Sequence, residues 1–331
     1  MKTTPNSAWS RRDLLALAGA TGLALHLSAH AQGSYPNKPV RMIVPLAAAS
    51  AVDVAARVLA QKMSASMGQN VLIENIVGAA GIIGAEKLTK AAPDGYTIGG
   101  FNDSILTMVP NLSKTPFNPV TDFSPVTIVA DIEFSISVPT DSPFKTVTEL
   151  VAAAKAAPGK YTYGSGGNGS PQHLAGAMFA AQMGIDLRHV PYRGASQAAL
   201  DTAGGQVDMT LQGIATVASL AKGGKLRLIG VMRNSRHPEF PDAPTLKEQG
   251  INDFTFKTWF GMVAPTGTPK DIIQRLHREV VKALADPEVK EKYAALGLVP
   301  NGCTPDEMAA VIREQLERYG KAVRDNHIKV G

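Results

Sequence analysis

The sequence is poor in the residues that build disulfides and metal centres. Of its 331 residues only Cys303 is a cysteine, so no intramolecular disulfide is available even in an oxidising compartment. The histidines beyond residue 31 form no pair at metal-ligand spacing on one helix, and neither G-x-S-x-G nor H-E-x-x-H occurs. Cys303 follows Asn301-Gly302 without an obvious base. We therefore expect no metal, no cofactor and no catalytic residues.

A long apolar run is also missing. The apolar stretch after Arg11-Arg12 is interrupted by glycines and His26 and is too short to span a bilayer comfortably. It ends in Ala29-His30-Ala31, an A-x-A cleavage site. This pattern predicts a signal peptide over residues 1–31, cleaved after Ala31, and export to the periplasm. The paired arginines favour the twin-arginine route, and an ordinary secretory peptide is the alternative.

The chain has little excess charge of either sign. The predicted signal peptide carries three of the 33 basic and one of the 28 acidic residues, so the mature chain keeps 30 and 27, a net charge of +3. No basic run is interleaved with aromatic residues, which make up 6% of the sequence. Nucleic acid is therefore not expected as a partner, whereas a small anionic ligand is compatible with this balance.

Strand-like runs alternate with helical patterns along the chain. The predicted strands are 40–46, 70–76, 97–101, 161–165, 187–192, 207–213 and 226–232. The helices between them include 51–67 and 81–92, and a long amphipathic helix is predicted from Thr304 to about His327. Thr146 with Glu149, and Thr304 with Glu307, have the spacing of capping boxes. This alternation predicts an α/β architecture with largely parallel sheets.

The run 123–140 breaks this rhythm because it is too long for an ordinary strand of one compact domain. We interpret it as a chain passing between two lobes, with 226–234 as the return crossing. Lobe 1 would be discontinuous, 35–130 plus 235–331, and lobe 2 would be 131–234. A ligand is then expected between the lobes, where the carboxyl ends of strands carry binding loops.

A glycine-rich loop follows one predicted strand. Gly164, Gly166 and Gly169 spell G-x-G-x-x-G, the spacing of a dinucleotide-binding turn. That function requires an acidic residue at the end of the next strand, which instead ends in Tyr192-Arg193-Gly194. Asp186 lies at the wrong end of this strand. Because an arginine can accommodate a 2′-phosphate, an exported NAD(P)-dependent oxidoreductase is the alternative function.

The same loop also predicts an anion site of another kind. Ser170-Pro171 is a helix start, so a helix to about Met183 would direct unpaired N–H groups toward the loop. Ser165, Asn168 and Ser170 add side-chain donors, and His173 lies close by in the first turn. The alternative is that Ser170 only caps the helix, that the glycines only turn the chain and that His173 only fills the first turn.

Other strand ends supply further candidate ligand-binding residues. Arg193 is a possible carboxylate clamp or a solvated surface charge, Gln212 offers both a donor and an acceptor, and Asp53 supports the first turn of its helix. The remaining candidates are Leu46, Ala47 and Ala48 after the first strand, Asn102 and Ser104 after the third, and Tyr192 and Gly194 beside Arg193.

Several ordered segments give the chain a resemblance to a known family over nearly its whole mature length. They are YPNKPVRMIVPL, AAPDGYTIG, NPVTDFSPVTIVA, GKYTYGSGGNGSPQHLAG, HVPYRGASQAALDTAGGQVDM, GKLRLIGVMRNSRHPEFPDAPTLKEQG, FKTWFGMVAPTGTPKDII and ALADPEVKEKYAALG. The sequence resembles the solute-binding proteins of the tripartite tricarboxylate transporter family, which include the Bordetella uptake gene products. The resemblance implies a type II periplasmic binding-protein fold, with two lobes joined by a two-strand hinge. It also implies a small organic carboxylate ligand that a monomeric receptor delivers to membrane permease subunits.

The resemblance also implies a ligand site between the loops 46–50 and 165–170. His173 and Tyr192–Gly194 match positions adjoining the cleft, and Gln212 stands where the family often varies with ligand. The first loop departs from the family: Ala47-Ala48-Ala49-Ser50 replaces Pro-Gly-Gly or Ala-Gly-Gly, while Asp53 persists. Because alanine tolerates positive φ less well than glycine, we expect a differently shaped loop and a different ligand. A binding protein that serves as a sensor would have the same site.

Overall fold

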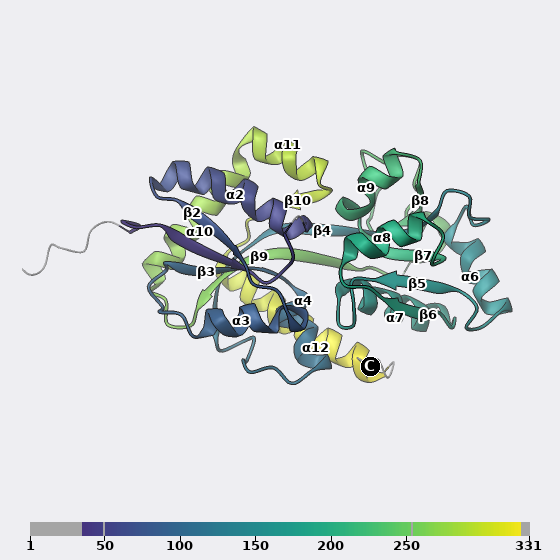
Figure 1. The fold of residues 1–331 in the computed structure, drawn as a ribbon, viewed down its shortest axis with the longest axis horizontal. Helices are drawn as coiled ribbons and strands as arrows, with labels where there is room; N and C mark the ends of the chain where they lie inside the picture. Colours follow the sequence, from purple (N-terminus) through teal and green to yellow (C-terminus); the bar gives the residue numbers. More distant parts are fainter. Residues whose placement is uncertain (1–34, 49, 253, 326–331) are drawn as a thin grey trace, which may run out of the picture. The chain divides into compact units, whose positions relative to one another are not determined.

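Two β-sheets share the long strand β4 (Phe123–Pro139) in the computed structural model, which describes residues 35–48, 50–252 and 254–325 (Figure 1). The predicted signal peptide and Ala49 lie outside these residues. The contacts within the chain divide it into two units, Met1–Asn37 and Lys38–Gly331. The sheets and helices described below lie in the second unit. The division into lobes 35–130 plus 235–331 and 131–234 stays a prediction.

The first sheet joins β4 to strands from both ends of the chain. Its other members are β1 (Val40–Val44), β2 (Val71–Asn75), β3 (Thr97–Asn102), β9 (Lys257–Pro265) and β10 (Leu298–Pro300). The second sheet contains the other half of β4 with β5 (Thr162–Ser165), β6 (Arg188–Pro191), β7 (Met209–Gly213) and β8 (Leu226–Val231).

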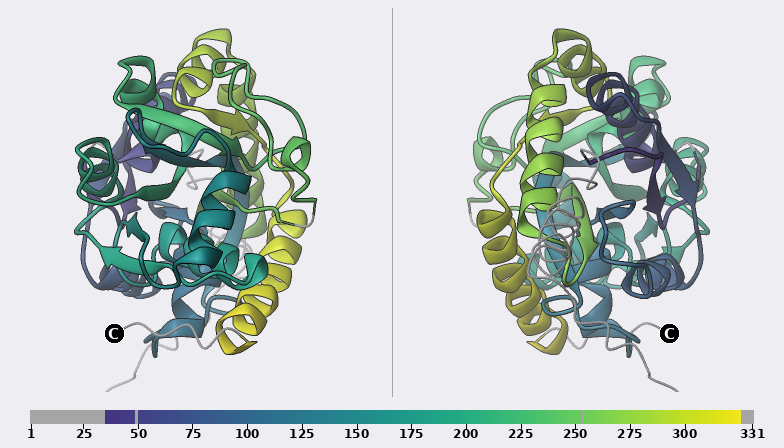
Figure 2. Two further views of the ribbon diagram at one scale, coloured as in Figure 1. Left: turned by 90° about the vertical axis from the view of Figure 1, so that its right-hand side faces the viewer. Right: turned by 90° about the vertical axis from the view of Figure 1, so that its left-hand side faces the viewer.

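Helices connect and cover these strands (Figures 1 and 2). The α-helices are α2 (Ala51–Met67), α3 (Ile82–Thr89), α4 (Ser104–Thr107), α5 (Val109–Leu112), α6 (Val147–Ala156), α7 (Pro171–Met183), α8 (Ala195–Ala203), α9 (Ile214–Lys222), α10 (Lys270–Ala285), α11 (Pro287–Ala295) and α12 (Pro305–Asp325). Two 3₁₀ turns, Ala79–Gly81 and Lys247–Gln249, complete the set. No helix among the described residues is both long enough and apolar enough to pass through a bilayer.

The sheets are mixed, which corrects the expectation of largely parallel pairing. β1 is parallel to β2 and β3, and β5 is parallel to β6 and β7, as the alternation predicts. In contrast, β4 runs antiparallel to β7, β8, β9 and β10. A run of apolar residues predicts that a strand is buried but not which neighbours it pairs with, so the pairing of β4 was not predictable.

The return crossing predicted at 226–234 is also corrected. β8 pairs only with Ser135–Pro139 of β4, within the second sheet. The following residues stay with that sheet, because Ala243 and Phe240 pack on its apolar core and Thr245 bridges to Val231. The chain enters the first sheet only through β9, which pairs with β4 from Phe123 to Glu133.

The predicted helix starts are confirmed. Ser170 caps α7 by accepting a hydrogen bond from His173 N, and Thr146 with Glu149 forms a capping box on α6. The Thr304–Glu307 pair does the same for α12, which packs on β4 together with α10 (Figure 2). Each cap satisfies orphan N–H groups at a helix start, so the chain enters these helices at defined positions.

The segment before α3 contains backbone strain that the sequence does not reveal. Ala79 and Ala80 both adopt positive φ, 45° and 53°, and both side chains are exposed. For an L-residue this conformation costs about 1–2 kcal/mol. The side chain of Ala80 therefore costs conformational energy without contributing burial.

We expect Ala80→Gly to raise the free energy of unfolding by about 1 kcal/mol, because the relief of strain exceeds the entropy that glycine adds to the unfolded chain. Ala152→Gly is the matched control, since Ala152 is exposed inside α6. It should lower stability by about 0.5–1 kcal/mol. Urea unfolding of both variants measures this difference, and equal effects would contradict strain at Ala80.

Candidate ligand site at the strand ends

The parallel strands β5, β6 and β7 end at one edge of the second sheet, and most of the predicted residues meet there. Tyr192 N donates to Ser165 O at 3.0 Å, which joins the loops that follow β5 and β6. A Cβ on Gly166 would lie 3.0 Å from the backbone nitrogen of Ala195, the first residue of α8. Glycine at 166 therefore allows the loop to lie directly against the start of this helix.

Side chains at this edge bind one another rather than solvent. Ser165 is fully buried, and its Oγ lies 2.6 Å from His189 Nε2 while also accepting from Gly167 N at 3.1 Å. Gly169 N donates to His173 Nδ1 at 3.2 Å. The His173 ring stacks on the His189 ring, with centroids 4.1 Å apart and planes 13° apart. The two histidines thus bind two residues of the glycine loop, and Ser165 in turn binds Gly167.

The histidine pKa values are low for a physical reason. Burial, together with the adjacent His173, lowers the pKa of His189 to about 4. Burial also lowers the pKa of His173. Both imidazoles are therefore neutral near pH 7, which leaves Nδ1 of His173 free to accept from Gly169 N. His189 is a residue that sequence analysis missed, because it lies inside the strand β6 and its partners come from other elements.

Gln212 is committed to the scaffold on both sides of its amide. It is fully buried at the end of β7, where Nε2 donates to Ala195 O at 2.8 Å and Oε1 accepts from Gln172 Nε2 at 3.1 Å. This chain of hydrogen bonds links α7, β7 and α8. Gln212 therefore joins the starts of two helices, and both polar atoms of its amide already have a partner.

The polar groups that remain unpaired here are mostly backbone N–H groups. Within the described residues, the N–H groups of Gly166 and Asn168 have no hydrogen-bond partner. α8 begins after Gly194 without a side-chain cap, so its first N–H groups are also unpaired. Arg193 is exposed and forms no ion pair with any described residue. A cavity of about 620 Å³ lies here, lined by Pro191, Tyr192, Arg193, Gly194 and Gln197.

The edge of the first sheet is organised around the buried carboxylate of Asp53. Arg57 binds both of its oxygens, at 3.0 and 3.1 Å, and Asn75 Nδ2 donates to Oδ1 at 2.8 Å. Asn75 Nδ2 also donates to Leu46 O, and Ser50 caps α2 by accepting from Asp53 N. Asp53 therefore fixes the loop after β1.

The residues of that loop are open to solvent. Leu46 is half-buried, and Ala47 and Ala48 are exposed. Neither alanine has positive φ, since among the described non-glycine residues only Ala79 and Ala80 do. At Ala47 and Ala48 the backbone therefore has a conformation that alanine tolerates.

Three adjacent residues end β3 at the same edge. Asn102 Nδ2 donates to Ser104 Oγ at 2.7 Å, and Oδ1 of the same buried amide has no partner. Between them Asp103 is completely buried, and neither carboxyl oxygen has a hydrogen-bond partner of normal geometry. Burial raises the pKa of Asp103 well above its ordinary value, and backbone N–H groups of Ser104 and Trp259 offset this only partly. Asp103 was also missed by sequence analysis, which named only its neighbours Asn102 and Ser104 as candidates.

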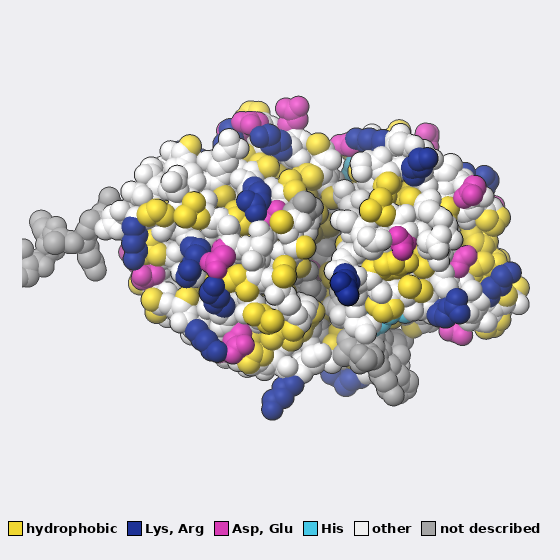
Figure 3. All heavy atoms as spheres, viewed as in Figure 1, with side chains coloured by type: hydrophobic (Ala, Val, Ile, Leu, Met, Phe, Trp, Pro, Cys, Tyr) yellow, Lys and Arg dark blue, Asp and Glu magenta, His cyan; other side chains and the backbone are white. Residues whose placement is uncertain are grey.

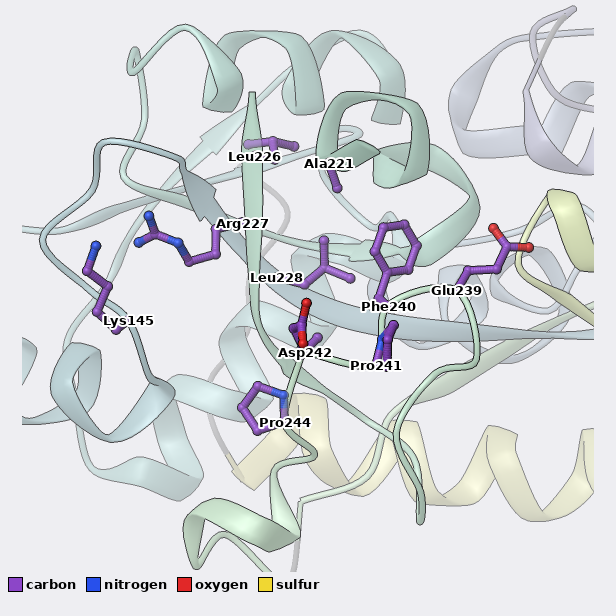
Figure 4. Close-up of a pocket in the computed structure, with 11 residues that line it drawn as sticks. Lys145, Ala221, Leu226, Arg227, Leu228, Glu239, Phe240, Pro241, Asp242 and Pro244 are labelled. Atoms are coloured by element: carbon purple, nitrogen blue, oxygen red, sulfur yellow. The ribbon is translucent and has the colours of Figure 1, made fainter. Parts of the chain in front are cut away.

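A second cavity, of about 340 Å³, contains none of the predicted residues (Figure 4). Its lining includes Lys145, Arg227, Glu239 and Phe240. Arg227 donates to the carbonyl oxygens of residues 140, 142 and 144, and Glu239 pairs with Lys222. Arg227 and Glu239 already have partners, and the remaining charges of the lining, Lys145 and Asp242, are of opposite sign, so this cavity is the poorer candidate for an anionic ligand.

The surface charge agrees with the sequence. On the face drawn in Figure 3, Lys and Arg are interspersed with Asp and Glu, and the surface is hollowed between the part over α2 and β1 and the part over α8 and β5. Among the described residues no cluster of three or more His, Cys, Asp or Glu side chains could hold a metal ion. The hollow separates the two loop-bearing sheet edges.

Two sheets joined by a shared strand, with loops at parallel strand ends, form the fold of the periplasmic binding proteins. The structure of the periplasmic binding protein BugD matches with a TM-score of 0.81 at 32% identity, covering 89% of this chain and 99% of that one. A structure of R. palustris Rpa4515 with adipate matches with a TM-score of 0.84 at 29% identity, covering 89% and 99%.

Sequence comparisons define the family. The model of the tripartite tricarboxylate transporter family receptor matches residues 55–328. Protein BugT of Bordetella pertussis is 32% identical over 326 residues, 96% of this chain and 98% of its own length. The chain belongs to the tripartite tricarboxylate transporter receptor family, whose members are periplasmic solute-binding receptors. The predicted family and fold class are confirmed.

The raised pKa of Asp103 predicts a pH-dependent stability. An acid whose pKa is higher in the folded state stabilises the fold at low pH, and that contribution is lost as pH rises from about 4 through the folded-state pKa. Asp103→Asn removes the charge and should raise the free energy of unfolding by about 2 kcal/mol at pH 8, with a smaller gain at pH 4. Asp141→Asn, at an exposed turn, should leave the free energy of unfolding unchanged at both pH values. Urea unfolding at both pH values checks this prediction. An equal gain in stability of Asp103→Asn at pH 4 and pH 8 would contradict a raised pKa of Asp103.

Proposed function

We propose that this protein is an exported solute-binding protein that captures a small organic carboxylate and delivers it to a tripartite tricarboxylate-type permease. Family membership gives the receptor class. The relative Rpa4515, which was solved with adipate, supports a carboxylate as the ligand class. Residues 1–31 would be removed as a signal peptide after Ala31, and the mature protein would act in the periplasm as a monomer.

The observation that carries the proposal is the set of unpaired backbone N–H groups at the edge of the second sheet. Gly166, Asn168 and the start of α8 offer several donors close together, and a helix N-terminus carries partial positive charge. A carboxylate can be buried only if it is fully hydrogen-bonded, and these N–H groups provide bonds without a lysine. Arg193 adds the one full positive charge at the cavity rim.

The side chains at this edge support that arrangement. Ser165, His173 and Gln212 have internal partners, so the loop keeps its shape without a ligand. We assign them the role of holding the donors in place, and Asn168, Ser170, Tyr192 and Gly194 the role of surrounding the ligand. A preorganised site binds more tightly because little conformational entropy is lost on binding.

The edge of the first sheet would close over the other end of the ligand. Ala47 and Ala48 offer exposed apolar surface, the half-buried Leu46 adds backbone groups, and the buried pair Asn102–Ser104 lies at the same edge with Asn102 Oδ1 unpaired. We propose that two lobes, one around each sheet, close on the ligand by bending at β4 and β9. The segment around Phe240–Thr245 then belongs with lobe 2 rather than with the predicted 235–331. Closure would bury the carboxylate and create the surface that the permease subunits recognise.

A sensor that uses the same site is the second candidate, because capture by lobe closure can serve signalling as well as transport. The nicotinamide-dependent oxidoreductase gains no support from the comparisons. The glycine loop does lie between β5 and α7, but β6 ends in Pro191 and is followed by Tyr192-Arg193, without the acidic residue that would bind the ribose.

A thermal-shift panel on residues 32–331 tests the function. We expect one class of mono-, di- or tricarboxylate to raise the melting temperature, because a ligand that binds only the folded state stabilises it by mass action. NAD(H) and NADP(H) should give no shift. A shift with a nicotinamide nucleotide and with no acid would overturn the proposal in favour of the oxidoreductase.

Gly166→Ala tests the site. The added methyl group would lie 3.0 Å from Ala195 N and 3.2 Å from Gln172 Oε1, over the proposed donors. We expect the Kd of the best carboxylate, measured by calorimetry, to rise at least about tenfold, equivalent to about 1.4 kcal/mol. Gly204→Ala is the matched control, since its methyl group would meet nothing closer than 3.6 Å at the far end of α8. Equal Kd values for the two variants would refute this location.

A further inference from the structure

The loop that carries the proposed donors is held by two histidine rings in addition to hydrogen bonds within its own sequence. Between Ser165 and Ser170 the backbone uses positive φ at Gly167 and Gly169, 116° and 77°, so local preference alone leaves many alternatives open. Ser165 Oγ and Ser170 N bind Gly167 within the loop, and His189 on β6 and His173 on α7 add contacts from outside it. These residues supply fixed polar partners on two separate elements.

His189 acts on the loop through Ser165. Its Nε2 lies 2.6 Å from Ser165 Oγ, a short hydrogen bond that fixes the hydroxyl rotamer. The same Oγ accepts from Gly167 N at 3.1 Å, so the orientation of the hydroxyl sets the direction of the peptide between residues 166 and 167. Because Gly166 lies against Ala195 N, that peptide also determines how the loop meets the start of α8.

The two rings support each other. His173 stacks on His189 at 4.1 Å, and Tyr163 lies against His189 on β5, with ring centroids 5.0 Å apart. The Tyr163 hydroxyl donates to His173 O at 3.3 Å. The half-buried His189 ring is therefore confined between an aromatic ring and an imidazole ring, which leaves its Nε2 directed at Ser165.

We infer that His189 is a positioning residue of the carboxylate site, which orients the N–H groups of the glycine loop through the Ser165 hydroxyl and does not contact the ligand. The inference rests on the proposed function for its effect on affinity. The stacked histidines would then affect ligand affinity, which a histidine that only fills the core would not do.

The stacked arrangement of His173 and His189 requires both imidazole rings to be neutral. The titratable groups that face His189 are His173 from α7 and Tyr163 from β5, and neither is negatively charged near neutral pH. An imidazolium here would be partly desolvated without a counterion, consistent with the lowered pKa of about 4. At pH 7.5, above the ordinary pKa of histidine, both rings are therefore neutral.

Three variants measured at pH 7.5 against the best carboxylate of the thermal-shift panel test the inference. His189→Phe keeps the ring stack and removes Nε2, and should raise Kd about tenfold or more. His189→Gln places an amide near the position of Nε2 and should stay within about threefold of the wild type. His237→Phe is the matched control, because His237 is also buried, accepts a backbone N–H from Glu239 through Nδ1 and packs on Phe240 away from the site. Its Kd should not change.

A second readout does not depend on any ligand. Amide hydrogen exchange at Gly167 in the free protein should be faster in His189→Phe than in the wild type, and restored in His189→Gln. If His189→Phe does not fold, His189→Asn replaces it, because its shorter amide does not reach Ser165. A folded His189→Phe with wild-type Kd and wild-type exchange at Gly167 would overturn the inference, as would equal values for the Asn and Gln variants. If the wild type binds no carboxylate, the proposed function fails, and the exchange data alone decide the role of His189.

Discussion

The close approach of the glycine loop to the start of α8 is the contact on which the rest of the site depends. With Gly166 against Ala195 N, two segments that follow different strands bring backbone N–H groups close together. A side chain at 166 would occupy that space, and a side-chain cap at 194 would satisfy the donors internally. The protein instead has glycine at both positions and leaves the donors unpaired.

This arrangement is stable because the neighbouring polar side chains are already satisfied. Ser165, His173 and Gln212 form hydrogen bonds within the scaffold, so the cost of burying them is offset without a ligand. The first sheet follows the same principle, since Asp53 is held by Arg57 and Asn75 and in turn holds the loop after β1. At each sheet edge, buried side chains fix the loop, and other groups of the loop remain for a ligand.

Much of the fold was predictable from local signals, and the rest depends on distant pairing. The caps at Ser170, Thr146 and Thr304 gave the helix starts, since a cap and its N–H partner lie within three residues. The antiparallel neighbours of β4 and the return of the chain through β9 were not predictable, because nothing within the strand specifies its partners. The family resemblance supplied the fold class that these local patterns could not.

The candidate site shows the same division. Sequence analysis found the loops, because glycines, serines and a proline mark them. It missed His189 and Asp103, whose roles arise from burial and from partners on other elements. It also treated Ser165 and Gln212 as ligand donors, whereas their polar atoms have internal partners. Hydrogen bonds between residues far apart in sequence are visible only once the strands are in register.

The most direct test of the central claim is a ¹H–¹⁵N NMR titration of the mature protein with the carboxylate that stabilises it most. If backbone groups hold the ligand, the amide protons of Gly166 and Asn168 should move downfield in proportion to saturation, as expected for new bonds to a negative oxygen. The amide of Gly169, which already donates to His173, should move much less. A carboxylate that binds while Gly166 and Asn168 stay unchanged would contradict the account.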